Sequence, residues 1–244
     1  MRLLNIDRIG SVVLDRPQRR NAINGRTCRA LIEALKQADT DPDIRAILLR
    51  AEGQVFCAGL DLDEAASADS GDALDRLFSD LFRIRGEIRK PIVGAVQGCA
   101  YGGGLGLVSL CHFVVASEEA TFALPEVNFG MWPYLVFDSV AEVIGSSATL
   151  RMSLLGSPIS AVEAKQLGLV STVVPQVDLM SKASNLARQL AEKDPNTVTL
   201  GLRWSTQRYL SETLQMRESA IAARQLAKQS PKFIEFMTAR RSKT

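Results

Sequence analysis

Two glycine-bearing segments contain the residues best suited to do chemistry in this chain. The first spans residues 56–62 with the sequence FCAGLDL, and the second spans 97–106 with the sequence QGCAYGGGLG. Glycine lets a backbone approach a ligand closely, so each segment can present an uncovered amide N–H. Two such N–H groups that converge on one point form an oxyanion hole, which stabilises charge on a carbonyl oxygen. The pair predicts chemistry on an activated carbonyl such as a thioester.

A base is also needed, because an enolate beside a thioester forms only when a group within reach removes the α-proton. Glu126 is the candidate, since it follows Pro125 directly after an apolar strand. A partly apolar pocket would raise the pKa of this carboxyl toward neutrality, which suits reversible proton transfer. The alternatives are that Glu126 is a solvated loop residue or a charge at a helix N-terminus, and that the glycine run is only a tight turn.

Apolar strands must hold these groups together. Strand-like stretches lie at 46–49, 91–96, 113–116 and 121–123. The first of them leads into the FCAGLDL segment, and the second leads into the glycine-rich turn, which opens a helix. The glycines lie at that helix N-terminus, where unpaired N–H groups and the helix dipole favour negative charge.

The remaining pattern predicts a hairpin over residues 3–14 and helical periodicity after residue 24 and over 74–88. For 65–71 we expect a mobile stretch or a loose helix start, because the residues are small and polar. Ser160 and Glu163 form a capping box. After Pro175 the chain is almost wholly helical, with boundaries predicted at Pro195 and Pro231. Strand–strand–helix units with a helical tail favour α/β architecture over a regular Rossmann alternation.

Five ordered motifs resemble those of the crotonase (enoyl-CoA hydratase/isomerase) superfamily. They are Asp15-Arg16-Pro17 with Asn21-Ala22, then Ala58-Gly59-Leu60-Asp61, Gly102-Gly103-Gly104, Leu124-Pro125-Glu126, and Ala164 with Leu167-Gly168-Leu169-Val170. The resemblance covers about residues 3–175 and is looser beyond. It implies a ClpP/crotonase-like α/β fold, in which residues 1–190 form a spiral of repeated ββα units. It also implies that the helical region 191–244 serves in trimer assembly, giving a homotrimer or a dimer of trimers.

The resemblance assigns roles as well. It implies that the oxyanion hole consists of the backbone N–H groups of Leu60 and Gly103, and that Glu126 moves the proton. The residues that it places along the coenzyme A path and the acyl pocket are Arg19, Arg20, Ala22, Ala58, Gly59, Asp61, Gly102, Trp132, Tyr134, Phe236 and Arg240. The alternatives are solvated arginines at 19 and 20, a solvated basic tail, and core positions for the two aromatic residues at 132 and 134.

The chain departs from the hydratase pattern at two places. Hydratases that resemble it carry a second glutamate three residues after the middle glycine of the triplet, where this chain has Gly106. They continue after the first glutamate with a glycine-rich stretch, where this chain has bulky residues at 131–135.

Asp138 or Glu142 could supply the missing acid, but both fall on a predicted helix and are expected to face solvent. One carboxylate suffices for isomerisation, which the pattern favours. Malonyl-type decarboxylation, true hydration and a non-catalytic acyl-CoA binder remain alternatives.

Composition limits the class of protein. The chain has 244 residues, 46% hydrophobic and 23% charged, with a formal net charge of +2. Such a balance does not favour nucleic acid or a membrane surface as partner. No apolar run approaches the ~18 residues of a membrane helix, and the four cysteines match no metal-ligand spacing. We expect a cytoplasmic enzyme without metal or redox cofactor, coenzyme A being part of the substrate. Structural roles are expected for His112, Cys57 and Cys99.

Overall fold

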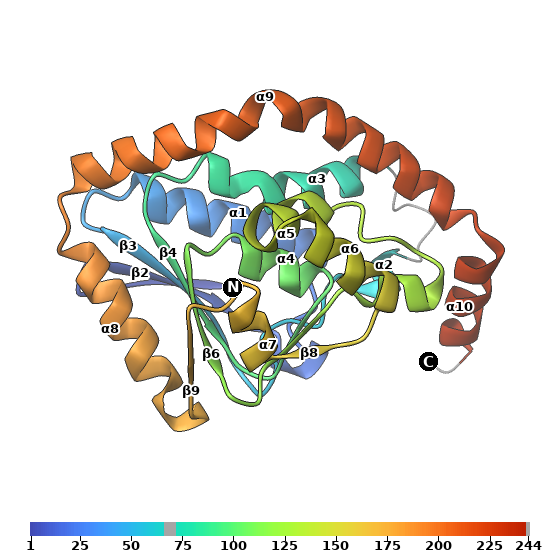
Figure 1. Cartoon of the computed structure of the whole chain (residues 1–244), viewed down its shortest axis with the longest axis horizontal. Helices are drawn as coiled ribbons and strands as arrows, with labels where there is room; N and C mark the ends of the chain where they lie inside the picture. Colours follow the sequence, from blue (N-terminus) through green and yellow to red (C-terminus); the bar gives the residue numbers. More distant parts are fainter. Residues whose placement is uncertain (66–71, 243–244) are drawn as a thin grey trace.

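The computed structural model describes residues 1–65 and 72–242 (Figure 1). Our expectation for 65–71 therefore falls, from residue 66 onward, outside the described part. Nine strands form two sheets in that part. The larger sheet has the order β1-β2-β3-β4-β6-β9, and the smaller has the order β5-β7-β8. The strands are β1 (Arg2–Ile6), β2 (Ile9–Leu14), β3 (Ala46–Ala51), β4 (Ile92–Val96), β5 (Cys99–Tyr101), β6 (Phe113–Ser117), β7 (Thr121–Ala123), β8 (Ile159–Ser160) and β9 (Thr172–Val174).

Parallel pairing dominates the larger sheet. Only β1 and β2 pair antiparallel there, as the predicted hairpin, while β2-β3, β3-β4, β4-β6 and β6-β9 are parallel. In the smaller sheet β5 pairs parallel with β7, and β8 pairs antiparallel with β7. Parallel strands need crossover connections, and helices supply them here. The four predicted strands are confirmed, whereas the short strands β5, β8 and β9 were not predicted.

Ten α-helices and four 3₁₀ turns connect and cover the sheets in the described residues. The α-helices are α1 (Gly25–Thr40), α2 (Leu62–Ala65), α3 (Asp72–Arg83), α4 (Gly103–Ser109), α5 (Phe137–Ile144), α6 (Ser146–Leu155), α7 (Ala161–Gln166), α8 (Leu179–Ala191), α9 (Pro195–Lys228) and α10 (Pro231–Arg241). The 3₁₀ turns are η1 (Pro17–Arg19), η2 (Ile84–Gly86), η3 (Pro125–Phe129) and η4 (Gln176–Asp178). Within the described parts of these helices, none combines the length and hydrophobicity needed to cross a membrane.

Local sequence signals explain several helix ends. The capping box at Ser160 and Glu163 is present and begins α7. Pro195 and Pro231 each lie in the first turn of a helix, where a missing N–H costs nothing, so both predicted boundaries are confirmed. The helical pattern over 74–88 ends earlier than predicted, because α3 tightens into η2 after Arg83. The two-residue turn of the first hairpin places Asp7 and Arg8 at positive φ.

Two apolar clusters lie on the larger sheet. The main cluster joins α1, α3 and α4 to the strands and includes Leu31, Phe78 and Phe82. The second cluster joins Leu48 and Val115 to small residues of α8, so α8 covers a separate patch of the sheet. Figure 1 shows α8 beside the strands and the long α9 arching past α3 to reach α10.

The helical tail is fastened to the core at two places. Asp75 of α3 is buried and accepts hydrogen bonds from Arg224, Gln225 and Lys228 of α9 at 2.9, 2.6 and 2.9 Å. Farther along, a third apolar cluster is built on Met131, Phe233 and Met237. Because Met131 follows η3, this cluster holds α10 against the loop that carries Glu126. The division of the chain into a spiral core over 1–190 and a C-terminal helical region over 191–244 stays a prediction.

Candidate active site

The two glycine-bearing segments meet at the start of α4. Isolated parallel bridges pair Cys57 with Ala100 and Ile23 with Leu60, which holds the first segment beside β5. Gly59 has φ +103°, and a Cβ there would lie 2.9 Å from the carbonyl oxygen of Tyr101. The same Cβ would lie 3.5 Å from the amide nitrogen of Gly103, so only glycine permits this approach.

The amides of Leu60 and Gly103 are available as donors. Their neighbours are engaged: the Asp61 N–H donates to Ile23 O at 2.8 Å, and the Gly102 N–H donates to Ala123 O at 2.9 Å. Among the described residues neither Leu60 nor Gly103 donates its N–H to a protein acceptor. Gly103 is the first residue of α4, where an amide has no intrahelical partner and the helix dipole favours an anion.

Glu126 lies against this turn. It is the second residue of η3, which follows β7. A Cβ on Gly102 would lie 2.7 Å from Glu126 Oε1, so the carboxylate lies directly against the glycine turn. Its Oε2 is buried and has no hydrogen-bond partner within the described part of the chain.

The surroundings of Glu126 raise its pKa to about 7, with burial as the main cause. A backbone hydrogen bond and the charge of Arg224 act in the opposite direction. Arg224 is 8% exposed, and Asp75 fixes its Nε. A carboxyl that titrates near neutral pH exists in both protonation states, as a group that takes and returns a proton requires.

The position of the second glutamate in the hydratase pattern is closed by packing. Gly106 lies one turn along α4, with its N–H bonded to Gly102 O at 3.0 Å. A Cβ there would lie 2.7 Å from Val136 Cγ1 and 2.8 Å from two ring carbons of Phe82. Contacts this short exclude even a methyl group unless the neighbours shift. The arrangement therefore offers a single carboxylate beside the two amides.

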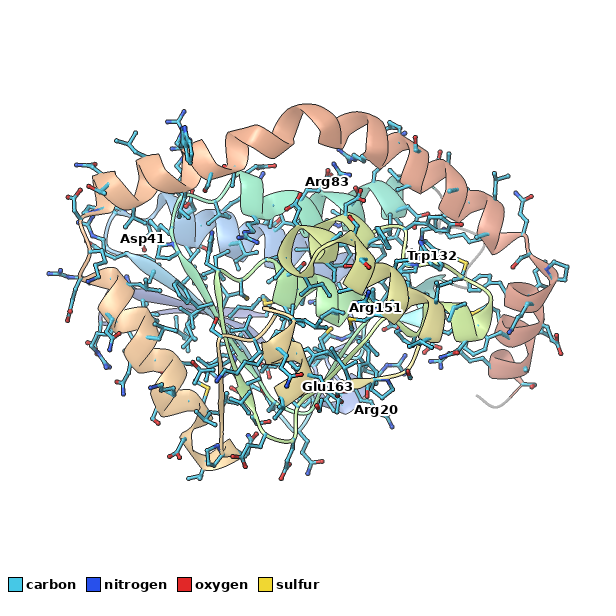
Figure 2. All side chains as sticks on the ribbon, viewed as in Figure 1. Arg20, Asp41, Arg83, Trp132, Arg151 and Glu163 are labelled. Atoms are coloured by element: carbon cyan, nitrogen blue, oxygen red, sulfur yellow. The ribbon has the colours of Figure 1, made fainter. Side chains whose placement is uncertain are left out.

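Asp138 and Glu142 lie on α5 as predicted. The expectation that both face solvent holds for Glu142, which is exposed, and is wrong for Asp138, which is half-buried. Both line a cavity of about 320 Å³ that Phe82 also lines. Burial raises the pKa of each carboxyl, while the nearby arginines lower it. Figure 2 shows Arg83, which is 3.7 Å from Asp138, beneath the arch of α9.

The residues expected along the coenzyme A path gather around η1 and α2. Arg19 forms ion pairs with Asp61, at 3.5 Å, and with Asp63. Asp63 also pairs with Arg240 of α10 at 3.2 Å, so these side chains form one network. Arg20 is exposed, and its carbonyl accepts the Ala58 N–H at 3.0 Å. Arg20 lies on the side of the molecule away from α9 (Figure 2). Ala22 precedes the bridge residue Ile23.

Aromatic residues of the acyl and tail regions are paired rather than scattered. Phe236 of α10 stacks on Phe129 of η3 with ring centroids 5.0 Å apart. Trp132 stacks on Phe137 at 6.1 Å and is half-buried, so it is not a fully enclosed core residue. The Tyr134 N–H donates to Trp132 O at 2.8 Å. Phe236 of α10 and Phe137 of α5 thus support the stretch from Phe129 to Trp132 from two sides of the sequence.

The structural roles expected for His112 and Cys57 are confirmed. His112 Nδ1 accepts the Ile92 N–H at 3.0 Å, and burial lowers its pKa to about 3. Burial raises the pKa of the Cys57 thiol to about 12 and that of Cys99 less far. Neither thiol is activated as a nucleophile. Among the described residues, no group of three His, Cys, Asp or Glu side chains could hold a metal ion.

Sequence reasoning missed Phe82, Val136 and Arg224. The helical pattern gave Phe82 the same weight as Phe78, since both lie on the apolar face of α3. The glycine at 106 was a usable signal, because a missing side chain inside a packed helix requires a neighbour to fill the space. Arg224 has its acidic partner 149 residues away, so no local pattern marks it.

Comparison with known proteins agrees with the fold. Residues 6–235 match the family described as enoyl-CoA hydratase/isomerase. A "Probable enoyl-CoA hydratase" of Bacillus subtilis is 35% identical over 217 residues, which are 86% of this chain and 84% of that protein. "Probable enoyl-CoA hydratase echA8" of Mycobacterium leprae is 36% identical over 186 residues, 76% of this chain and 72% of that protein. The crystal structure of an enoyl-CoA hydratase/isomerase from Xanthobacter autotrophicus Py2 superposes with a TM-score of 0.90 at 26% identity, covering 99% of this chain and 92% of that one.

These similarities show that the α/β fold is the crotonase fold, as the five motifs predicted. The chain belongs to the enoyl-CoA hydratase/isomerase family, whose members act on acyl-CoA thioesters.

Proposed function

We propose that this protein moves a proton along an enoyl-CoA thioester, with Glu126 as the only base. The observation that carries the proposal is the contrast along α4. One carboxylate lies against Gly102 beside two available amides, whereas position 106 has no room for a second carboxylate. A 1,3-proton shift needs one base, and addition of water in this family uses two.

The proposed steps follow from this placement. The Glu126 carboxylate removes a proton from C2 of a 3-enoyl thioester, and the electron pair of that C–H bond moves toward the thioester oxygen. The N–H groups of Leu60 and Gly103 stabilise the resulting dienolate. Protonated Glu126 then delivers its proton to C4, the C3–C4 double bond becomes a single bond, and a C2–C3 double bond forms. No atom is gained or lost.

The pKa of Glu126 supports this cycle, since a value of about 7 leaves neither the base nor its conjugate acid strongly favoured at neutral pH. A second candidate is hydration, which the printed names of the relatives favour. Hydration would need another group to hold water. Asp138 and Glu142 are the acids of α5, and Phe82 lines the same cavity as they do.

The test is a product analysis. The wild-type protein and Glu126→Gln are incubated in D2O with 3-enoyl, 2-enoyl and malonyl-type CoA esters, the isomeric enoyl esters are separated by chromatography, and the products are followed by mass. We expect 3-enoyl ester to become 2-enoyl ester with wild type and not with the variant. Rapid 3-hydroxyacyl product from the 2-enoyl ester would establish hydration instead. Loss of CO2 that survives Glu126→Gln would establish decarboxylation.

Further assignments rest on the family resemblance. We propose that Arg19, Arg20, Ala22, Ala58 and Asp61 line the coenzyme A path, and that Phe236 and Arg240 close over it. A homotrimer or dimer of trimers, a cytoplasmic location and activity without metal or redox cofactor are proposed likewise. Light scattering coupled to size-exclusion chromatography tests the assembly, and activity after chelation tests the metal.

A further inference from the structure

Phe82 lies between the proposed oxyanion hole and the cavity beneath α9. It is the penultimate residue of α3 and is 2% exposed. A Cβ on Gly103 would lie 3.3 Å from its Cζ, and a Cβ on Gly106 would lie 2.8 Å from its Cδ1 and Cε1. The ring of Phe82 therefore covers the face of α4 from the proposed donor Gly103 to Gly106.

Phe82 also lines the cavity of about 320 Å³ on its other side. Leu110, Leu135, Ser139 and Trp204 are among the remaining walls, so the cavity is bounded by α4, α5 and α9. Its volume falls within the range of small-ligand pockets, about 300–1,000 Å³. Apolar side chains such as Leu110 and Leu135 share the lining with the charged residues Arg83, Arg85, Asp138 and Glu142.

We infer that Phe82 is a specificity-determining residue. Its ring forms a partition between the acyl site and the cavity beneath α9, and it thereby restricts the enzyme to short acyl chains. A longer chain would need the space in that cavity. The inference rests on the proposed function, because it takes Gly103 to be the donor beside which the acyl group begins. An acyl group that is held there by its carbonyl and runs along α4 toward Gly106 meets this ring.

A matched control lies on the same helix. Phe78 is one turn earlier, is also 2% exposed and belongs to the same apolar cluster. It does not line the cavity, and it is not among the atoms nearest to Gly103 or Gly106. A large-to-small change at Phe78 therefore removes core packing without opening the partition.

The experiment measures chain-length preference in two ways. The variants are Phe82→Ala, the smaller change Phe82→Leu, and Phe78→Ala. Turnover of 3-hexenoyl-CoA and 3-decenoyl-CoA gives a ratio of kcat/KM values, and calorimetry with hexanoyl-CoA and decanoyl-CoA gives the same ratio for binding alone. A fourth variant, Ser139→Phe in the Phe82→Ala background, refills the cavity from α5.

We expect wild type to favour the hexenoyl ester. Phe82→Ala should raise the decenoyl-to-hexenoyl ratio by about tenfold or more, since each methylene moved from water to an apolar wall contributes about fourfold. Phe82→Leu should give a smaller rise, Phe78→Ala should leave the ratio within about twofold, and Ser139→Phe should reverse the gain. An unchanged ratio in a folded Phe82→Ala protein, or a wild-type enzyme indifferent to length, would overturn the inference.

The two proposals fail in different ways. If no ester is turned over but Phe82→Ala selectively strengthens decanoyl-CoA binding, the partition stands and the proposed chemistry fails. If wild type isomerises both esters equally, the chemistry stands and the partition fails.

Discussion

Two sets of acids lie on opposite sides of Phe82, and they differ in what surrounds them. Glu126 has a pKa raised by burial, an Oε2 without a partner in the described chain, and two amides available nearby. Asp138 and Glu142 also have pKa values raised by burial, yet they face arginines across a cavity. A raised pKa alone does not identify a catalytic acid. What distinguishes Glu126 is its contact with the glycine turn that presents the donors.

The largest effect on activity is expected from removing the carboxylate of Glu126, the acid that lies beside the two amides. Glu126→Gln keeps the shape of the side chain and removes the base, so we expect kcat to fall about a thousandfold, within the range found for general acid–base groups. Initial rates with a 3-enoyl-CoA ester measure it. The matched control is Glu142→Gln on the other side of Phe82, which should retain most activity. Equal losses in the two variants would contradict the distinction drawn between the two sets of acids.

A second change tests the closed position on α4. Gly106→Glu places a side chain where Val136 and Phe82 already lie, so we expect the free energy of unfolding to fall by about 3 kcal/mol. Urea denaturation measures it. In a double-mutant cycle, Gly106→Glu should cost less in the Phe82→Ala background than in wild type, because the ring no longer fills the space. The control is Gly201→Glu on α9, where a Cβ would meet no atom within 4 Å and stability should hardly change. If Gly106→Glu is as stable as wild type, position 106 is not closed.

A third prediction concerns Arg224 and pH. Glu126 must be ionised to act as base, so kcat/KM should fall as the pH drops below about 7. The charge of Arg224 lowers that pKa, and Arg224→Met should therefore move the acidic limb of the pH profile to higher pH. Arg224→Lys should leave the limb nearly in place. The control is Arg76→Met, because Arg76 pairs with Glu218 at the surface. A limb that stays fixed in Arg224→Met would remove Arg224 from the account.

The smallest effect is expected at Asp138. Asp138→Asn removes an ion pair with Arg83 that is 3.7 Å long and partly exposed, so stability should change by less than about 1 kcal/mol. Isomerisation rates should change less than about threefold, since the residue lies behind Phe82. Thermal melting and initial rates measure both. A loss comparable to that of Glu126→Gln would make Asp138 the second acid and favour hydration.

The sequence predicted the fold class and the parts of the site that local chemistry requires. Glycines at 59 and 103 and the acid after Pro125 were recognisable because a close backbone approach and a buried base each need particular residue types. Long-range packing was not recognisable. Nothing in the helical pattern separates Phe82 from Phe78, and Arg224 gains its role only when α9 folds back over α3. Asp138 on α5 was expected in solvent, because residues of α9 that are distant in the sequence line the same cavity.

The most direct test of the account is hydrogen exchange at the α-carbon of a saturated acyl-CoA that cannot complete any reaction. Butyryl-CoA is incubated in D2O with wild type, and mass spectrometry follows deuterium at C2. The account predicts exchange that depends on Glu126 and disappears in Glu126→Gln, while calorimetric binding persists. Binding of butyryl-CoA to wild type without any exchange would contradict the claim that two amides and one glutamate generate an enolate here.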